Sequence, residues 1–221
     1  MHVIGDRRTG GRSALDVVRH CLGLDAVDVV PVGELRCTSP ARTALDLALS
    51  RSFAEAVVVA DAVFARYPGA RDDFGELLRM LGPGTRGIRR AARVLDFADP
   101  RSESVGESWS RVLIHELGFQ APELQSTVYL GSRRVGVVDF EWVEQRIVGE
   151  FDGEVKYRRR EYRQGRTPEQ VVIDEKNREN DLRRAARSVA RWTWDDLRDR
   201  RRLEDLLTEA GVPRTHPRAH R

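Results

Sequence analysis

The chain has 221 residues, with 38 basic and 35 acidic side chains and a formal net charge of +3. This length suits one large domain or two small ones, and a composition of 40% hydrophobic and 33% charged residues indicates a globular protein and argues against disorder. No run of 18 apolar residues occurs, and the first eleven residues lack the apolar core of a signal peptide. The sequence therefore predicts a cytoplasmic protein without a membrane span, whose two cysteines, Cys21 and Cys37, are free thiols.

The positive charge is concentrated in the second half of the chain. Residues 155–202 contain 16 basic and 9 acidic side chains, a local net charge of +7, whereas the remainder carries −4. Such a basic segment suits a polyanionic partner such as DNA, although a solvated arginine-rich surface is an equally good interpretation. Only Lys156 and Lys176 are lysines, and an ammonium group can lose its proton where a guanidinium cannot, so both are candidates for a chemical role.

The first part of the chain is predicted to be a mostly helical domain over residues 1–98. It starts with a β-rich stretch around a glycine turn at 25–38, and then Ser39-Pro40 and the Ser52/Glu55 capping box open two helices. Two further helices are expected at about 71–81 and 85–98, separated by Pro83-Gly84. Asp61 lies within an apolar helix, where we expect it to form a hydrogen bond between helices.

Residues 99–211 are predicted to form a second domain of a different kind. The pattern indicates a helix at 103–117, three strands at 124–130, 134–142 and 146–153, a helix from 168 to about 186, a strand at 188–194 and a helix at 195–210. Residues 212–221 are expected to be a tail. Three consecutive strands followed by a helical crossover predict an α+β or α/β fold, with a mixed β-sheet flanked by helices.

The residues most suggestive of chemistry are three acids in the predicted strands. Asp139 lies inside one strand, and Glu150 and Asp152 end the next. Aspartate is disfavoured inside strands, and a buried carboxylate is costly unless it is paired or bound to a metal. Glu150 and Asp152 share one face of their strand, and a tight turn can place Asp139 beside them. The pattern predicts a Mg²⁺ or Mn²⁺ site that hydrolyses phosphodiesters; the alternative is acids at strand ends that face water.

Two further residues are candidates for the same site. Glu107 is expected to project from the preceding helix towards the sheet, although Ser104 and Glu107 also form a capping-box pattern and Glu103 lies one turn earlier. Lys156 has the strand parity of Glu150 and can reach the metal only if the chain bends. Glu175 and Lys176 are better explained by exposed ion pairs within their own helix.

The segments GESWSR, VVDFEWVEQRIVGEFDGEVKY and IDEKNRENDLRRAARSVARWTWDDL occur in this order between about 102 and 200. They resemble a Vsr-like endonuclease-fold family of the PD-(D/E)XK superfamily. The resemblance implies a restriction-endonuclease-like sheet and a DNA endonuclease, with Glu107, Asp139 and Glu150 as metal ligands. The superfamily usually has lysine two residues after the second sheet acid, where this chain has Asp152. Relatives with the Glu-x-Asp-Gly motif often have a histidine shortly afterwards, where this chain has Lys156.

The segment TSPARTALDLA at 38–48 and the helices after it resemble the C-terminal region of AbiEi-type antitoxins of type IV toxin–antitoxin systems. That resemblance implies a transcriptional regulator that binds DNA or a toxin protein. Such proteins usually begin with a winged helix-turn-helix, and the 37 residues before the motif are too few for one with its linker. Residues 1–37 are therefore either an intact start or the remainder of a truncated DNA-binding module. The sequence supports two hypotheses, a metal-dependent DNA endonuclease and a regulator without catalysis.

Overall fold

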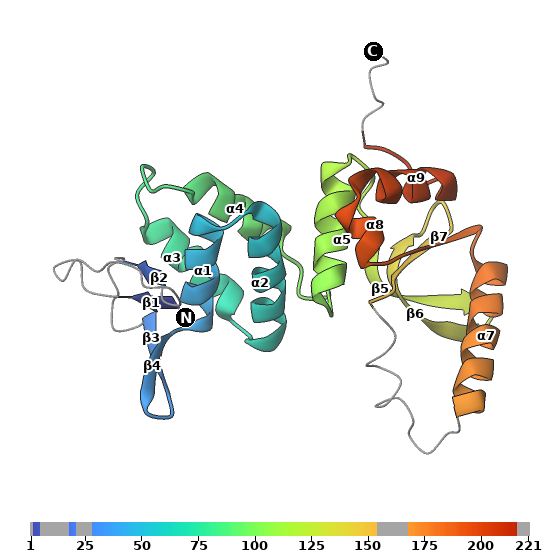
Figure 1. Ribbon diagram of the computed structural model, residues 1–221, viewed down its shortest axis with the longest axis horizontal. Helices are drawn as coiled ribbons and strands as arrows, with labels where there is room; N and C mark the ends of the chain where they lie inside the picture. The colour runs from blue at the N-terminus through green and yellow to red at the C-terminus, as the bar shows by residue number, and fades with distance from the viewer. Residues whose placement is uncertain (1, 5–17, 21–27, 154–167, 216–221) are drawn as a thin grey trace, which may run out of the picture.

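A computed structural model describes residues 2–4, 18–20, 28–153 and 168–215 of the chain. The described residues form a mixed α/β structure with a helical part on one side and a four-stranded sheet on the other (Figure 1). No helix in these ranges is long and apolar enough to cross a bilayer. The general α and β composition predicted from the sequence is therefore confirmed.

The helical part starts with two small sheets that precede four helices. Strands β1 (His2–Ile4) and β2 (Val18–His20) are parallel, whereas β3 (Val29–Val32) and β4 (Leu35–Thr38) form an antiparallel hairpin. Gly33 lies in the turn with φ +59, a conformation that favours glycine, which explains the predicted turn. The helices are α1 (Pro40–Ser50), α2 (Phe53–Arg66), α3 (Ala70–Met80) and α4 (Ile88–Phe97).

The first two helices begin at the positions that their N-capping residues indicated. The Ser39 hydroxyl accepts a hydrogen bond from the Arg42 amide, and Ser52 and Glu55 form the complete capping box. Small residues allow the helices to approach closely, because a buried alanine brings two backbones together without a cavity. The fully buried alanines of this core are Ala44, Ala48, Ala56, Ala60 and Ala91.

The sheet part has one mixed sheet with strand order β5-β6-β7-β8. The first two pairings are antiparallel and β7 pairs with β8 in parallel, so the crossover through α7 returns the chain to the same sheet. Its elements, in chain order, are α5 (Val105–Glu116), β5 (Glu123–Leu130), β6 (Arg133–Trp142), β7 (Ile147–Phe151), α7 (Pro168–Ala185), β8 (Ser188–Trp192), α8 (Trp194–Arg198) and α9 (Arg200–Ala210). The predicted order of helices and strands is confirmed from α5 to β8.

Helices cover both faces of this sheet. On one face Phe140, Trp142 and Trp192 pack with residues of α5 and α9. On the other face Val138 and Val148 pack against Leu182 of α7. Figure 1 shows α7 beside the sheet, on the side away from α5. The sheet therefore lies between two apolar layers that hold its strands in place.

The C-terminal segment differs from the prediction in two places. The single helix expected at 195–210 is divided at Asp199, because that residue is extended and its carboxylate accepts a hydrogen bond from the Arg201 amide to cap α9. The expected tail begins later than residue 212, since Val212 is buried in the sheet core. Arg214 binds the carbonyl oxygen of Leu117 at 2.7 Å. Val212 and Arg214 thus anchor residues that the sequence pattern predicted to belong to the tail.

Helix α5 joins the two parts of the molecule. Its Val112 belongs to the core of the helical part, whereas Leu113 and Ile114 belong to the core beneath the sheet. From the same helix, Arg111 donates a hydrogen bond of 2.7 Å to Asp61 of α2, which also accepts one from the Asp99 amide. The interhelical role predicted for Asp61 is confirmed.

Candidate functional site at the end of β7

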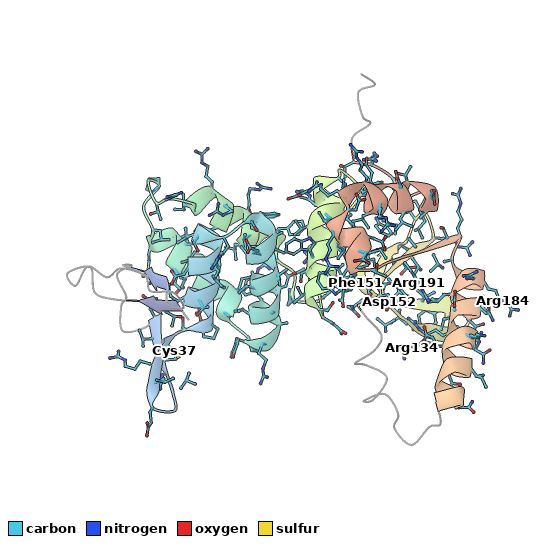
Figure 2. The ribbon with its side chains drawn as sticks, viewed as in Figure 1. Cys37, Arg134, Phe151, Asp152, Arg184 and Arg191 are labelled. Carbon is cyan, nitrogen blue, oxygen red and sulfur yellow. The ribbon has the colours of Figure 1, made fainter. Side chains whose placement is uncertain are left out.

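The candidate acids lie around Phe151, the last residue of β7. Glu150 and Asp152 are its chain neighbours, and its amide donates a hydrogen bond of 2.8 Å to Oδ2 of Asp139. Its ring faces Gly106 of α5, because a Cβ atom built on that glycine would lie 1.9 Å from Cε1 of the ring. Figure 2 labels Phe151 and Asp152 at this end of the sheet. The structure therefore brings the strand acids and the start of α5 to one place.

Asp139 is attached to the neighbouring strand through this contact. The paired register of β6 and β7 runs from Trp142 and Ile147 to Phe140 and Gly149, and Asp139 and Glu150 are the next residues along the two strands. The Asp139 carboxylate accepts a hydrogen bond from the Phe151 amide just beyond the last paired residues of β6 and β7. This contact brings the Asp139 carboxylate to the backbone between Glu150 and Asp152, and the sharing of one ion by these acids stays a prediction.

Glu107 is used mainly as a capping residue of α5. The side chain is 5% exposed, and its two oxygens accept hydrogen bonds from the Glu103 amide, the Ser104 hydroxyl and the Gln125 side-chain amide. The Ser104 hydroxyl in turn accepts one from the Glu107 amide. The contacts of Glu107 are therefore those of a helix-capping residue, which was the alternative interpretation of the sequence. Its role as a metal ligand stays a prediction.

Glu150 is held by two arginines from different elements. Its Oε1 lies 2.6 Å from Nη2 of Arg178 on α7, and its Oε2 lies 2.8 Å from Nη2 of Arg191, its register partner on β8. Burial lowers the pKa of the Arg178 guanidinium, but the charge and hydrogen bond of Glu150 outweigh that effect and leave the pKa above its ordinary value. Glu150 is thus a carboxylate with both oxygens next to positive charge.

The other candidates are arranged differently. Asp152 is exposed at the end of β7, where its amide donates to the carbonyl of Trp192. Glu175 forms an i,i+3 pair with Arg178 at 3.4 Å, as the ion-pair interpretation predicted. Lys176 is exposed on the same helix. Lys156 lies outside the described residues.

The expected cluster of three metal ligands is not gathered in this structure. Among residues 2–4, 18–20, 28–153 and 168–215, no three His, Cys, Asp or Glu side chains approach closely enough to hold one ion. The physical reason lies in the partners of the acids, because Glu150 is drawn to two guanidiniums and Glu107 caps a helix. Any cation held here would depend on fewer carboxylates than the sequence pattern suggested.

The sequence pattern predicted exposed ion pairs on helix α7, to which Arg178 belongs, and predicted no role for Arg191. One signal for Arg191 was present, since a charged residue interrupts the apolar strand SVARW. Its parallel register with Glu150 could be known only once β7 and β8 were paired. Figure 2 labels Arg191 near Phe151 and Asp152.

A Gly106→Ala substitution tests how tightly α5 packs on this site. The added methyl group would overlap the Phe151 ring, so the ring must move and the free energy of unfolding should fall by about 1–3 kcal/mol. Urea denaturation measures this change. Gly82→Ala is the matched control, because a Cβ atom there meets nothing within 4 Å. Equal stability of the two variants would show that Phe151 does not pack against α5.

Comparison with known proteins gives a partial match. No family model matches the chain, and no solved structure matches it significantly. Two curated relatives from strains of Mycobacterium tuberculosis, "Uncharacterized protein Rv2248" and "Uncharacterized protein MT2308", are each 32% identical over 115 residues. The match covers 52% of this chain and 42% of each relative, so the chain spans about two fifths of their length.

Proposed function

We propose that the sheet part is a metal-dependent nuclease of the PD-(D/E)XK type that hydrolyses phosphodiester bonds in DNA. The observation that carries the proposal is the convergence of acids on Phe151, where Asp139 binds its amide and Glu150 and Asp152 flank it. The order of one helix, three antiparallel strands, a crossover helix and a parallel strand supports the endonuclease-like fold that the sequence resemblance implies.

Asp139 is a better candidate for a magnesium ligand than Glu107, and Glu150 would have to share its two oxygens between the metal and two arginines. Magnesium is commonly held by one or two carboxylates together with water and substrate phosphate, so two acids on adjacent strands are sufficient. The Glu107 oxygens, in contrast, already accept three hydrogen bonds from protein groups. A bound Mg²⁺ or Mn²⁺ would polarise the phosphate and lower the pKa of a bound water.

The remaining side chains have proposed roles that follow from their positions. Arg178 and Arg191 supply, beside Glu150, the positive charge that a lysine two residues after the acid would give in the superfamily. Guanidinium groups bind phosphate oxygens through two parallel hydrogen bonds, so these arginines suit the charge of a phosphodiester. Asp152 is exposed beside them and can accept hydrogen bonds from water. Contact of Lys156 with phosphate remains a prediction.

The experiment is a cleavage assay with purified protein, plasmid and single-stranded DNA in Mg²⁺ or Mn²⁺. We expect Asp139→Asn to lower the cleavage rate by about 100-fold or more, because the amide loses the negative charge that a cation requires. Asparagine keeps an oxygen that can accept the Phe151 amide, so the fold should be retained. Cleavage at equal rates by both proteins would point to a contaminating nuclease and contradict the assignment.

A second function is favoured by the double pairing of Glu150. A carboxylate neutralised by two arginines is suited to fixing a binding surface, as expected of an antitoxin-like regulator that binds DNA or a toxin without catalysis. Absence of cleavage by the unmodified protein, on either DNA form and with either metal, would favour this regulator over the nuclease.

A further inference from the structure

A hollow of about 450 Å³ lies beside the acid site, where α7 ends and β8 begins. Three arginines line it, together with one acid: Arg183, Arg187, Arg191 and Glu179. Glu179 lies 2.7 Å from Arg183 and 3.9 Å from Arg191, so one carboxylate is shared between two guanidiniums. The side chains that line the hollow therefore carry excess positive charge.

Two donor atoms of Arg191 form no hydrogen bond with the part of the chain that the structure describes. Its Nε and Nη2 atoms are buried and have no hydrogen-bond acceptor among the described residues. The 2.8 Å contact of Nη2 with Glu150 is an ion pair whose angles do not make a hydrogen bond. The Arg191 side chain is nevertheless 34% exposed and lines the hollow, so it adds positive charge there that a phosphate can approach.

Arg191 also connects the hollow to the acid site. It lines the hollow and at the same time contacts Glu150, which is a chain neighbour of Phe151. A ligand with regularly spaced negative charges could therefore occupy the hollow and continue towards Asp139 and Glu150. A nucleic-acid strand has this pattern of charge, whereas a single small anion would fill only one position.

We propose that this hollow binds the phosphate backbone of a nucleic-acid strand and guides it to the acid site. The inference rests on the proposed nuclease function and assigns the substrate contact outside the reacting centre. Arg183 and Arg187 hold the backbone phosphates, and Arg191 makes the contact next to Glu150. Phosphate contacts of this kind position a strand without reading its sequence, so binding is expected to depend on salt and little on sequence.

The test compares an Arg183→Gln/Arg187→Gln double variant with the unmodified protein. Fluorescence anisotropy measures the Kd for labelled single-stranded and duplex DNA of mixed sequence, in EDTA so that no cleavage occurs. We expect Kd to rise by about tenfold or more and the slope of log K against log salt to fall by about 2, one for each lost phosphate contact. The control is Arg66→Gln/Arg79→Gln, which removes the same charge from exposed positions of the helical part.

The outcomes separate this inference from the nuclease proposal. Unchanged Kd and salt slope in the double variant, with an unaltered melting temperature, would overturn the phosphate site even if the unmodified protein cleaves DNA. Equal weakening by the control pair would also overturn it, because net charge alone would then explain binding. A selective loss of binding supports the site, including when the unmodified protein proves unable to cleave.

Discussion

An Asp61→Ala substitution is expected to lower the free energy of unfolding by about 3–5 kcal/mol, the cost of removing one partner of a buried ion pair. Asp61 is 1% exposed, and Arg111, its partner at 2.7 Å, has a side chain that is 9% exposed. Alanine would leave that guanidinium without its buried counter-charge and the Asp99 amide without its acceptor. Urea or thermal denaturation followed by circular dichroism measures the loss.

The control for Asp61 is an exposed ion pair. Asp195 and Arg198 are 2.7 Å apart, with side chains 74% and 73% exposed, so Asp195→Ala should change stability by less than about 1 kcal/mol. If Asp61→Ala were equally mild, the pair would be open to solvent and could not join α2 to α5. A double Asp61→Leu/Arg111→Leu variant should recover part of the loss, because neither charge remains buried.

The same pair gives a prediction for pH. Burial raises the pKa of Asp61 above its ordinary value near 3.8, and the charge of Arg111 opposes this shift without cancelling it. A raised pKa in the folded state contributes stability that is complete below the unfolded pKa and is lost as pH rises through the folded pKa. Arg111→Met removes the opposing charge, so its deficit relative to the unmodified protein should be larger near neutral pH than near pH 4. A deficit independent of pH would contradict this account.

The second large effect is expected from Trp192→Ala, which should cost about 3–5 kcal/mol. The indole is fully buried, lies 5.2 Å from the Phe140 ring in a stacked arrangement and donates a hydrogen bond of 2.7 Å to the Ser110 hydroxyl. Its removal leaves a cavity between α5 and the sheet, next to Gly149 of β7, the strand that carries Glu150. Denaturation of the purified variant measures the loss, with the half-buried Trp194→Ala as the milder control.

A double-mutant cycle makes the Trp192 prediction specific. A methyl group at Gly149 would lie 2.6 Å from Cη2 of Trp192, so Gly149→Ala alone should destabilise by about 1–3 kcal/mol. In the Trp192→Ala background the methyl group has space, and much of that cost should disappear. Additive effects of the two substitutions would show that the indole does not occupy the space left by Gly149.

Local patterns predicted most of the secondary structure. Three helices begin after a serine whose hydroxyl accepts a hydrogen bond from an unpaired backbone amide of the first turn; these are Ser39, Ser52 and Ser104. The alternation of apolar and polar residues indicated the strands of the sheet part. The predicted single helix at 195–210 was wrong, since the capping property of Asp199 outweighed a continuous helical pattern. Such competition between neighbouring capping residues is decided by backbone geometry, which the sequence does not display.

The candidate site was predicted only in part. A tight turn was expected to place Asp139 beside Glu150, and the Asp139 carboxylate accepts a hydrogen bond from the amide of Phe151, the residue after Glu150. The arginines of Glu150 come from positions 28 and 41 residues later, and only the crossover through α7 brings them back. With arginine so frequent in this chain, composition could not indicate which guanidiniums turn inward.

Helix α5 has a consequence for how the protein melts and for how it could have been assembled in evolution. Adjacent residues of this helix, Val112 and Leu113, are buried in different cores, and Arg111 connects it to α2. Unfolding of either half would remove one of the two apolar cores against which α5 packs, and this would lower the stability of the other half. We therefore expect the two halves to unfold as one cooperative unit, and we expect an exchange of either half at residues 98–104 to require a new surface that receives α5.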